Sequence, residues 1–257
     1  MKRFLLHVCM VLLSVSSVHA TVFLVGRNIA VFPEDAQNSF MLKKEGHSYL
    51  VIIPNNPEKV KKISPLYAKW EKDIGCNKRG VIIGAYPEED KNLFVASLQA
   101  LVNADREKEP TQSFLCGTRA QKDVWNFSGG PVKTNLTEEE FIRRILLNAQ
   151  RYISASKQSP VDYHAFRSLW ENVKNSDADW AQNCNAFAFS LLVYSGASEL
   201  PSIIIGRRSM PGHKRLLPSS LFYSFPRVPG LLEDIRKKEA SKTILDRINF
   251  LMRNAHC

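Results

Sequence analysis

Cys184 and His47 are the two residues whose types and surroundings best suit nucleophilic chemistry. Cys184 follows Asn183, a predicted N-cap, so it should lie in the first turn of a helix. Unpaired backbone N–H groups and the positive end of the helix dipole stabilise a thiolate there, and the same N–H groups can stabilise an oxyanion. We therefore expect Cys184 to act as a nucleophile. A buried or disulfide-bonded structural cysteine is the competing interpretation.

His47 is the predicted base. It follows a glycine and precedes a run of strand character at residues 48–54, which would fix its backbone and let the imidazole face a cleft at a sheet edge. It would take the thiol proton and later protonate the leaving group. His213 is the alternative base, although no predicted strand frames it. His164 is interpreted as structural, and His256 lies at the end of the chain.

The elements that must position these residues follow from the apolar patterns along the chain. Strand character is found at residues 21–31, 46–54 and 79–87. Helical patterns are found at residues 93–102, 138–154, 163–173 and 183–196. A Gly-Gly-Pro sequence at 129–131 predicts a break. Strands early and helices late favour one α+β domain over residues 21–257, which closes with a basic amphipathic helix.

Residues 1–20 have the three parts of a secretory signal peptide. Lys2 and Arg3 form a positive start, an apolar run covers residues 4–15, and small residues lead up to Ala20. The run is shorter than the roughly 20 residues that span a bilayer, and no later segment is long and apolar enough. We expect cleavage after Ala20, a secreted or periplasmic protein, and no transmembrane span.

The charge balance is basic, with a formal net charge of +10. Loss of Lys2 and Arg3 with the signal peptide would leave about +8. Such an excess can attract anionic polymers or lipid headgroups. The basic residues are scattered and have no interleaved aromatic residues, so a solvated basic surface is preferred and nucleic-acid binding is not expected.

Four cysteines stay in the chain after residue 20: Cys76, Cys116, Cys184 and Cys257. An exported protein can form disulfides, and four cysteines allow three full pairings. We favour a Cys76–Cys116 disulfide, which would staple the second strand to the following segment and leave Cys184 free. No ligand spacing typical of a zinc site occurs, so we expect neither a metal nor a cofactor.

Two short motifs together resemble a known superfamily. Gly-His-Ser-Tyr-Leu-Val-Ile at 46–52 opens a strand, and Asn-Cys-Asn-Ala-Phe-Ala at 183–188 opens a helix much later. This order is similar to the permuted papain-like superfamily, which includes relatives of the NlpC-type cell-wall peptidases and the lecithin:retinol acyltransferase-like proteins. The resemblance implies a small antiparallel sheet packed against the cysteine-bearing helix. It also implies a cysteine hydrolase, with Cys184 and His47 as catalytic residues.

The resemblance further implies an amide or ester substrate, with a peptidoglycan peptide as the first choice and a lipid acyl group as the second. Members usually carry a third polar residue on the strand after the histidine to orient the imidazole. Here that strand is almost wholly apolar, and Tyr86 and Ser48 are the only candidates. A non-catalytic secreted binding protein on the same fold is therefore the alternative, followed by a disulfide-stabilised domain in which Cys184 is structural. The sequence specifies no oligomeric state.

Overall fold

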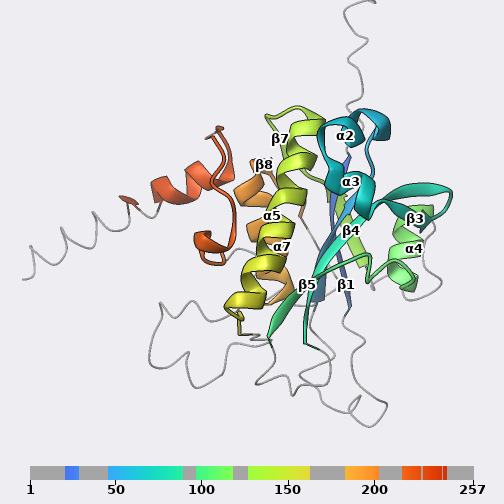
Figure 1. Cartoon of the computed structure of the whole chain (residues 1–257), viewed down its shortest axis with the longest axis horizontal. Helices are drawn as coiled ribbons and strands as arrows, with labels where there is room; N and C mark the ends of the chain where they lie inside the picture. Colours follow the sequence, from blue (N-terminus) through green and yellow to red (C-terminus); the bar gives the residue numbers. More distant parts are fainter. Residues whose placement is uncertain are drawn as a thin grey trace, which may run out of the picture.

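A six-stranded antiparallel sheet forms the centre of the computed structural model (Figure 1). Its strands are β1 (Val22–Asn28), β2 (Gly46–Ile52), β3 (Lys72–Gly75), β4 (Lys78–Pro87), β5 (Leu98–Val102) and β6 (Phe127–Pro131). The strand order is β3-β4-β2-β1-β6, with β5 also paired to β4. A separate two-stranded sheet joins β7 (Lys133–Thr134) to β8 (Ala197–Glu199). The protein is therefore a mixed α+β structure, as the sequence predicted in outline.

The structure describes residues 21–28, 46–88, 97–117, 127–162, 183–202, 216–226, 228–238 and 240–241. The predicted signal peptide and the predicted helix at 163–173 lie outside the described residues. So do His164, His213, His256 and Cys257.

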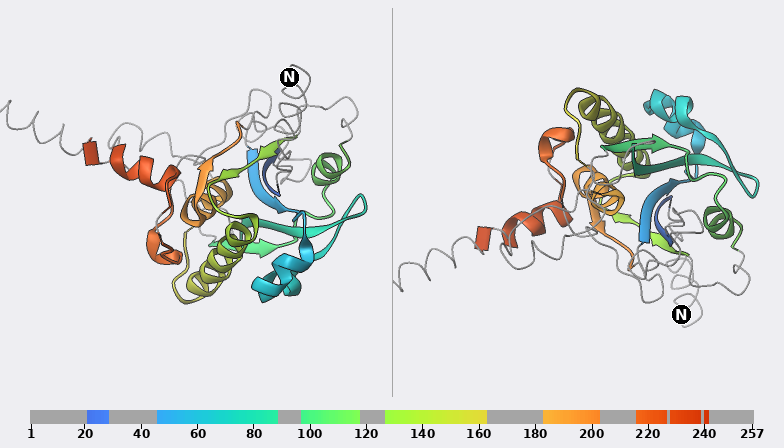
Figure 2. Two further views of the ribbon diagram at one scale, coloured as in Figure 1. Left: turned by 90° about the horizontal axis from the view of Figure 1, so that it is seen from above. Right: turned by 90° about the horizontal axis from the view of Figure 1, so that it is seen from below.

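Helices cover both faces of the sheet. They are α2 (Pro57–Ile63), α3 (Pro65–Trp70), α4 (Glu109–Cys116), α5 (Glu138–Gln158) and α7 (Cys184–Ser195), with a 3-10 turn at Ser219–Leu221 and helical turns at 231–238. Figure 2 shows α5 and α7 on one face of the sheet and α4 on the other. This arrangement places the amino end of α7 and the start of β2 within one layered core.

The two faces of β2 pack into different cores, because successive side chains of a strand point to opposite sides. Leu50 and Ile52 belong to the larger core, which α5 and α7 complete. Tyr49 and Val51 belong to a smaller core that includes Leu115 of α4. The burial of both faces explains why residues 49–52 of this strand are apolar, with no alternation of polar and apolar residues.

Two predicted local structures are wrong. The segment expected to be helical at 93–102 contains the strand β5, in which the buried residues Leu98 and Ala100 alternate with exposed ones. A period of two, rather than the helical period, therefore governs this stretch. The expected break at 129–131 is the edge strand β6, which pairs only with β1 among the described strands. A proline is tolerated there because an edge strand has one side without a partner.

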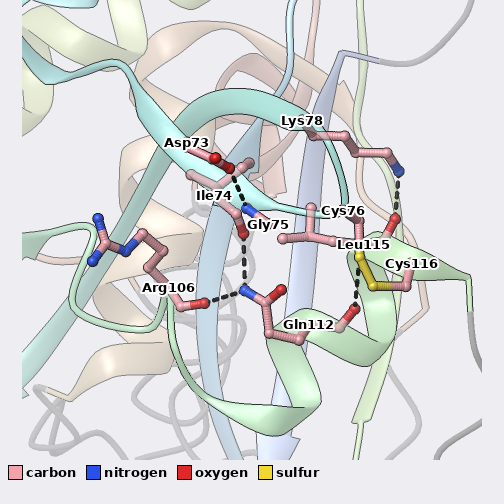
Figure 3. The surroundings of a disulfide bond; sticks show 9 residues. All are labelled: Asp73, Ile74, Gly75, Cys76, Lys78, Arg106, Gln112, Leu115 and Cys116. Atoms are coloured by element: carbon pink, nitrogen blue, oxygen red, sulfur yellow. Dashed lines mark hydrogen bonds between the residues drawn. A yellow bond between two sulfur atoms is a disulfide. The ribbon is translucent and has the colours of Figure 1, made fainter.

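The Cys76–Cys116 disulfide is present as predicted and joins the turn between β3 and β4 to the end of α4. Figure 3 shows the hydrogen bonds around it. The Gln112 side chain donates to the carbonyl oxygens of Ile74, at 2.9 Å, and of Arg106. These contacts fix α4 and the turn before it against the edge of the sheet.

The strand that carries His47 and the helix that begins at Cys184 were both predicted close to their observed bounds. Helix α5 continues four residues beyond its predicted end, to Gln158. In α7 the predicted N-cap Asn183 and the predicted stop Gly196 are both observed. Gly196 has φ of 102°, a left-handed conformation that favours glycine.

Candidate active site

Cys184 is the first residue of α7 and is free and buried, with 3% of its surface exposed. The Asn183 side chain accepts hydrogen bonds from the backbone N–H groups of Asn185 and Ala186, at 3.0 and 3.1 Å. The cap therefore takes up two of the donors that the sequence suggested would be unpaired.

His47 is the second residue of β2, with 4% of its surface exposed. Its Nε2 atom is 3.2 Å from a carboxylate oxygen of Asp105. Burial alone would lower the pKa of His47. The charge of Cys184, hydrogen bonds to Asp105 and Cys184, and the charge of Asp105 outweigh burial and raise this pKa to about 9.

Asp105 is the residue that completes the site, and its side chain is fully buried. It lies in the turn after β5, and its two oxygens have separate partners. Oδ1 accepts from Nε and Nη2 of Arg27, at 3.0 and 2.8 Å. Oδ2 faces His47 and also accepts a hydrogen bond from the Tyr86 hydroxyl. Burial would raise the pKa of Asp105, but the hydrogen bond and charge of His47 and the charge of Arg27 hold it well below its usual range.

The carboxylate beside His47 lies in a turn, whereas the residues expected to orient the imidazole, Tyr86 and Ser48, lie on strands. The two candidates on strands have other roles. Tyr86 lies 4.8 Å from the His47 ring, centroid to centroid, and supports Asp105. Ser48 points to the opposite side of β2 and donates to Asn185 at 2.8 Å. Asp105 was missed because residues 93–102 were interpreted as a helix. A strand at 98–102 would have placed Asp105 in a polar turn directly after it, where a site residue can be expected.

Comparison of the chain with known protein families, with curated proteins and with solved structures finds no match.

The described residues contain no group of three or more His, Cys, Asp or Glu side chains that could hold a metal ion. The Nε2 atom of His47 is engaged by Asp105, and the charge of Cys184 acts on the same imidazole. Among the described helices, none has the length and apolar character needed to cross a membrane.

The arrangement of Cys184, His47 and Asp105 combines a thiol, an imidazole and a carboxylate.

Proposed function

We propose that this protein is an exported cysteine hydrolase, with Cys184 as nucleophile, His47 as general base and acid, and Asp105 as the residue that orients His47. One observation carries the proposal: the buried His47 imidazole lies 3.2 Å from the Asp105 carboxylate and near enough to Cys184 for the charge of Cys184 to raise the pKa of His47. A protonated imidazole beside a thiol favours the thiolate, which is the reactive form. The buried setting strengthens this ion pair, because little water screens it.

The proposed reaction has two halves. The Cys184 thiolate attacks the carbonyl carbon of an amide or ester, and the oxyanion that forms accepts a hydrogen bond from the Cys184 N–H. The bond to the leaving group then breaks, His47 gives its proton to the departing amine or alcohol, and a thioester remains on Cys184. In the second half His47 takes a proton from water, which attacks the thioester and releases a carboxylic acid. The thiolate and the imidazolium are then restored.

The order of the two motifs supports placing the chain among permuted papain-like hydrolases. The histidine strand precedes the cysteine helix in sequence, and α7 packs on the face of the sheet formed by β2 and β4. A predicted signal peptide and a basic net charge of +10 favour an anionic extracellular polymer as substrate. We therefore propose a peptidoglycan peptide bond, with a lipid acyl group as the second choice.

A non-catalytic secreted binding protein on the same fold is the second candidate. The observation that favours it is the burial of Cys184, since a residue with only 3% of its surface exposed gives a bulky substrate little access. A binding protein would keep the buried network for stability and would form no acyl intermediate.

Acylation of Cys184 separates the two candidates. The mature protein would be mixed with p-nitrophenyl acetate, and the release of p-nitrophenolate followed together with the intact mass. A hydrolase gives a burst of one equivalent and an acetyl group that maps to Cys184, and Cys184→Ser gives neither. His47→Gln slows the burst by about 100-fold or more. Absence of the burst and of the acetyl group in the wild-type protein would favour the binding protein.

A further inference from the structure

Asn185 connects the helix of the nucleophile to the strand of the base. It follows Cys184 directly, and its side chain is buried. Nδ2 donates to the backbone oxygen of Gly46 at 3.0 Å, and Oδ1 accepts from the Ser48 hydroxyl at 2.8 Å. Gly46 and Ser48 are the two neighbours of His47. The amide therefore holds the backbone on both sides of the imidazole.

The same oxygen also lies 3.8 Å from the Cys184 sulfur, within the range of a weak S–H hydrogen bond. On the helix side, the Asn185 backbone N–H is fixed by the Asn183 cap at 3.0 Å. Asn185 thus has fixed partners at both its backbone and its side chain. These contacts leave little freedom for α7 to slide along β2.

We propose that Asn185 is a positioning residue that sets the approach of the Cys184 sulfur to the His47 imidazole. This role rests on the proposed function as a cysteine hydrolase. It adds the residue that keeps the Cys184 thiolate and the His47 imidazolium together. Asparagine suits this position because it supplies one donor and one acceptor on a short side chain. Aspartate lacks the donor for the Gly46 oxygen, and leucine fills a similar volume with neither group. A displacement of about 1 Å between reacting groups can cost about 100-fold in rate.

Asn148 offers a matched control at the other end of α7. It is a buried asparagine on α5, and its Nδ2 donates to the Ser195 hydroxyl at 3.0 Å. Its Oδ1 accepts from the backbone N–H of Tyr223 at 2.8 Å. Asn148→Leu therefore removes a buried side-chain amide that donates one N–H hydrogen bond and accepts one from an N–H group, and it leaves the surroundings of Cys184 unchanged.

The test compares iodoacetamide alkylation of Cys184 in the full mature protein at pH 6 and at pH 10. At pH 6 we expect Asn185→Leu to react about 100-fold more slowly than wild type, and Asn148→Leu to match wild type. At pH 10, where a thiol ionises without a partner, all three rates should converge. Ser48→Ala removes the hydrogen bond from the Ser48 hydroxyl to Asn185 Oδ1, keeps the one from Asn185 Nδ2 to the Gly46 oxygen, and should give an intermediate rate at pH 6. This milder variant keeps the test valid if Asn185→Leu does not fold.

Three results would contradict the positioning role. The first is a wild-type rate at pH 6 in both Asn185→Leu and Ser48→Ala, and the second is an equal loss in Asn148→Leu. The third is a loss in Asn185→Leu that persists at pH 10, because it would show a blocked or collapsed site rather than a broken ion pair. If wild-type Cys184 itself reacts at pH 6 no faster than a free thiol, the hydrolase proposal fails, and the role of Asn185 fails with it.

Discussion

Arg27 and His47 are directly opposite each other on adjacent antiparallel strands, and both bind the same carboxylate. Their Cα atoms are register partners between β1 and β2. Arg27 binds one oxygen of Asp105 and His47 faces the other. The strand register thus supplies two cations to one buried anion. Arg27 still balances the charge of Asp105 when His47 gives up its proton during the proposed reaction.

Replacing Arg27 with methionine should destabilise the fold strongly. The change leaves the buried Asp105 carboxylate with one cation, and removing one member of a buried ion pair typically costs about 3–5 kcal/mol. Chemical unfolding followed by circular dichroism measures this loss. Arg27→Lys should recover only part of it, because an ammonium group cannot supply the Nε and Nη2 donors of arginine together. Full recovery in the lysine variant would show that charge alone matters.

Replacing Asp105 with asparagine should lower the pKa of His47 from about 9. The change removes a negative charge and a hydrogen-bond acceptor, while burial, which opposes the imidazolium, stays. An NMR titration of the His47 imidazole, assigned by comparison with His47→Gln, would detect the shift. We also expect about 100-fold slower alkylation of Cys184 at pH 7. An unchanged titration would mean that Asp105 does not act on His47.

The raised pKa of His47 makes stability depend on pH. The folded pKa of about 9 lies above the ordinary value of 6.5, so the stabilisation is complete below pH 6.5 and is lost as the pH rises towards 9. The difference corresponds to about 3 kcal/mol. Unfolding in guanidinium chloride at several pH values should show this decline in wild type and not in His47→Gln. Parallel curves for the two proteins would contradict the assignment.

Removing the disulfide should lower stability without abolishing the site. Cys76 and Cys116 are 40 residues apart, for which loss of the constraint on the unfolded chain costs about 4 kcal/mol. In a chain of this size we expect the melting temperature of the Cys76→Ser/Cys116→Ser variant to fall by about 10 °C. Below its melting temperature the variant should still be alkylated at Cys184. Loss of that reaction in the folded variant would instead link the disulfide to the position of Asp105.

The sequence predicted the elements whose boundary signals are local. Asn183 and Gly196 mark the ends of α7, and the run after His47 is apolar because both faces of β2 are buried. Cysteine spacing and the export signal together favoured the observed disulfide. The helix and strand predictions use residues that are neighbours in sequence. The disulfide prediction uses four cysteines, which allow only three full pairings.

Contacts between residues far apart in the sequence could not be predicted from such local patterns. Asp105 and His47 are 58 residues apart, and only the pairing of β5 with β4 and of β4 with β2 brings them together. Arg27 looked like an ordinary strand residue, because its register with His47 depends on how β1 pairs. Asn185 belongs to the motif at residues 183–188, but its partners at residues 46 and 48 are 139 and 137 positions away.

The most direct test of the central claim is the rate of iodoacetamide alkylation of Cys184 near neutral pH, without reductant, in wild type and in His47→Ala. Mass spectrometry of the digested protein locates the modified cysteine. The proposed ion pair predicts fast modification of Cys184 in wild type and a rate at least about 100-fold lower in His47→Ala. Modification of wild-type Cys184 no faster than a free thiol, or equal rates in the two proteins, would contradict a Cys184–His47 hydrolase.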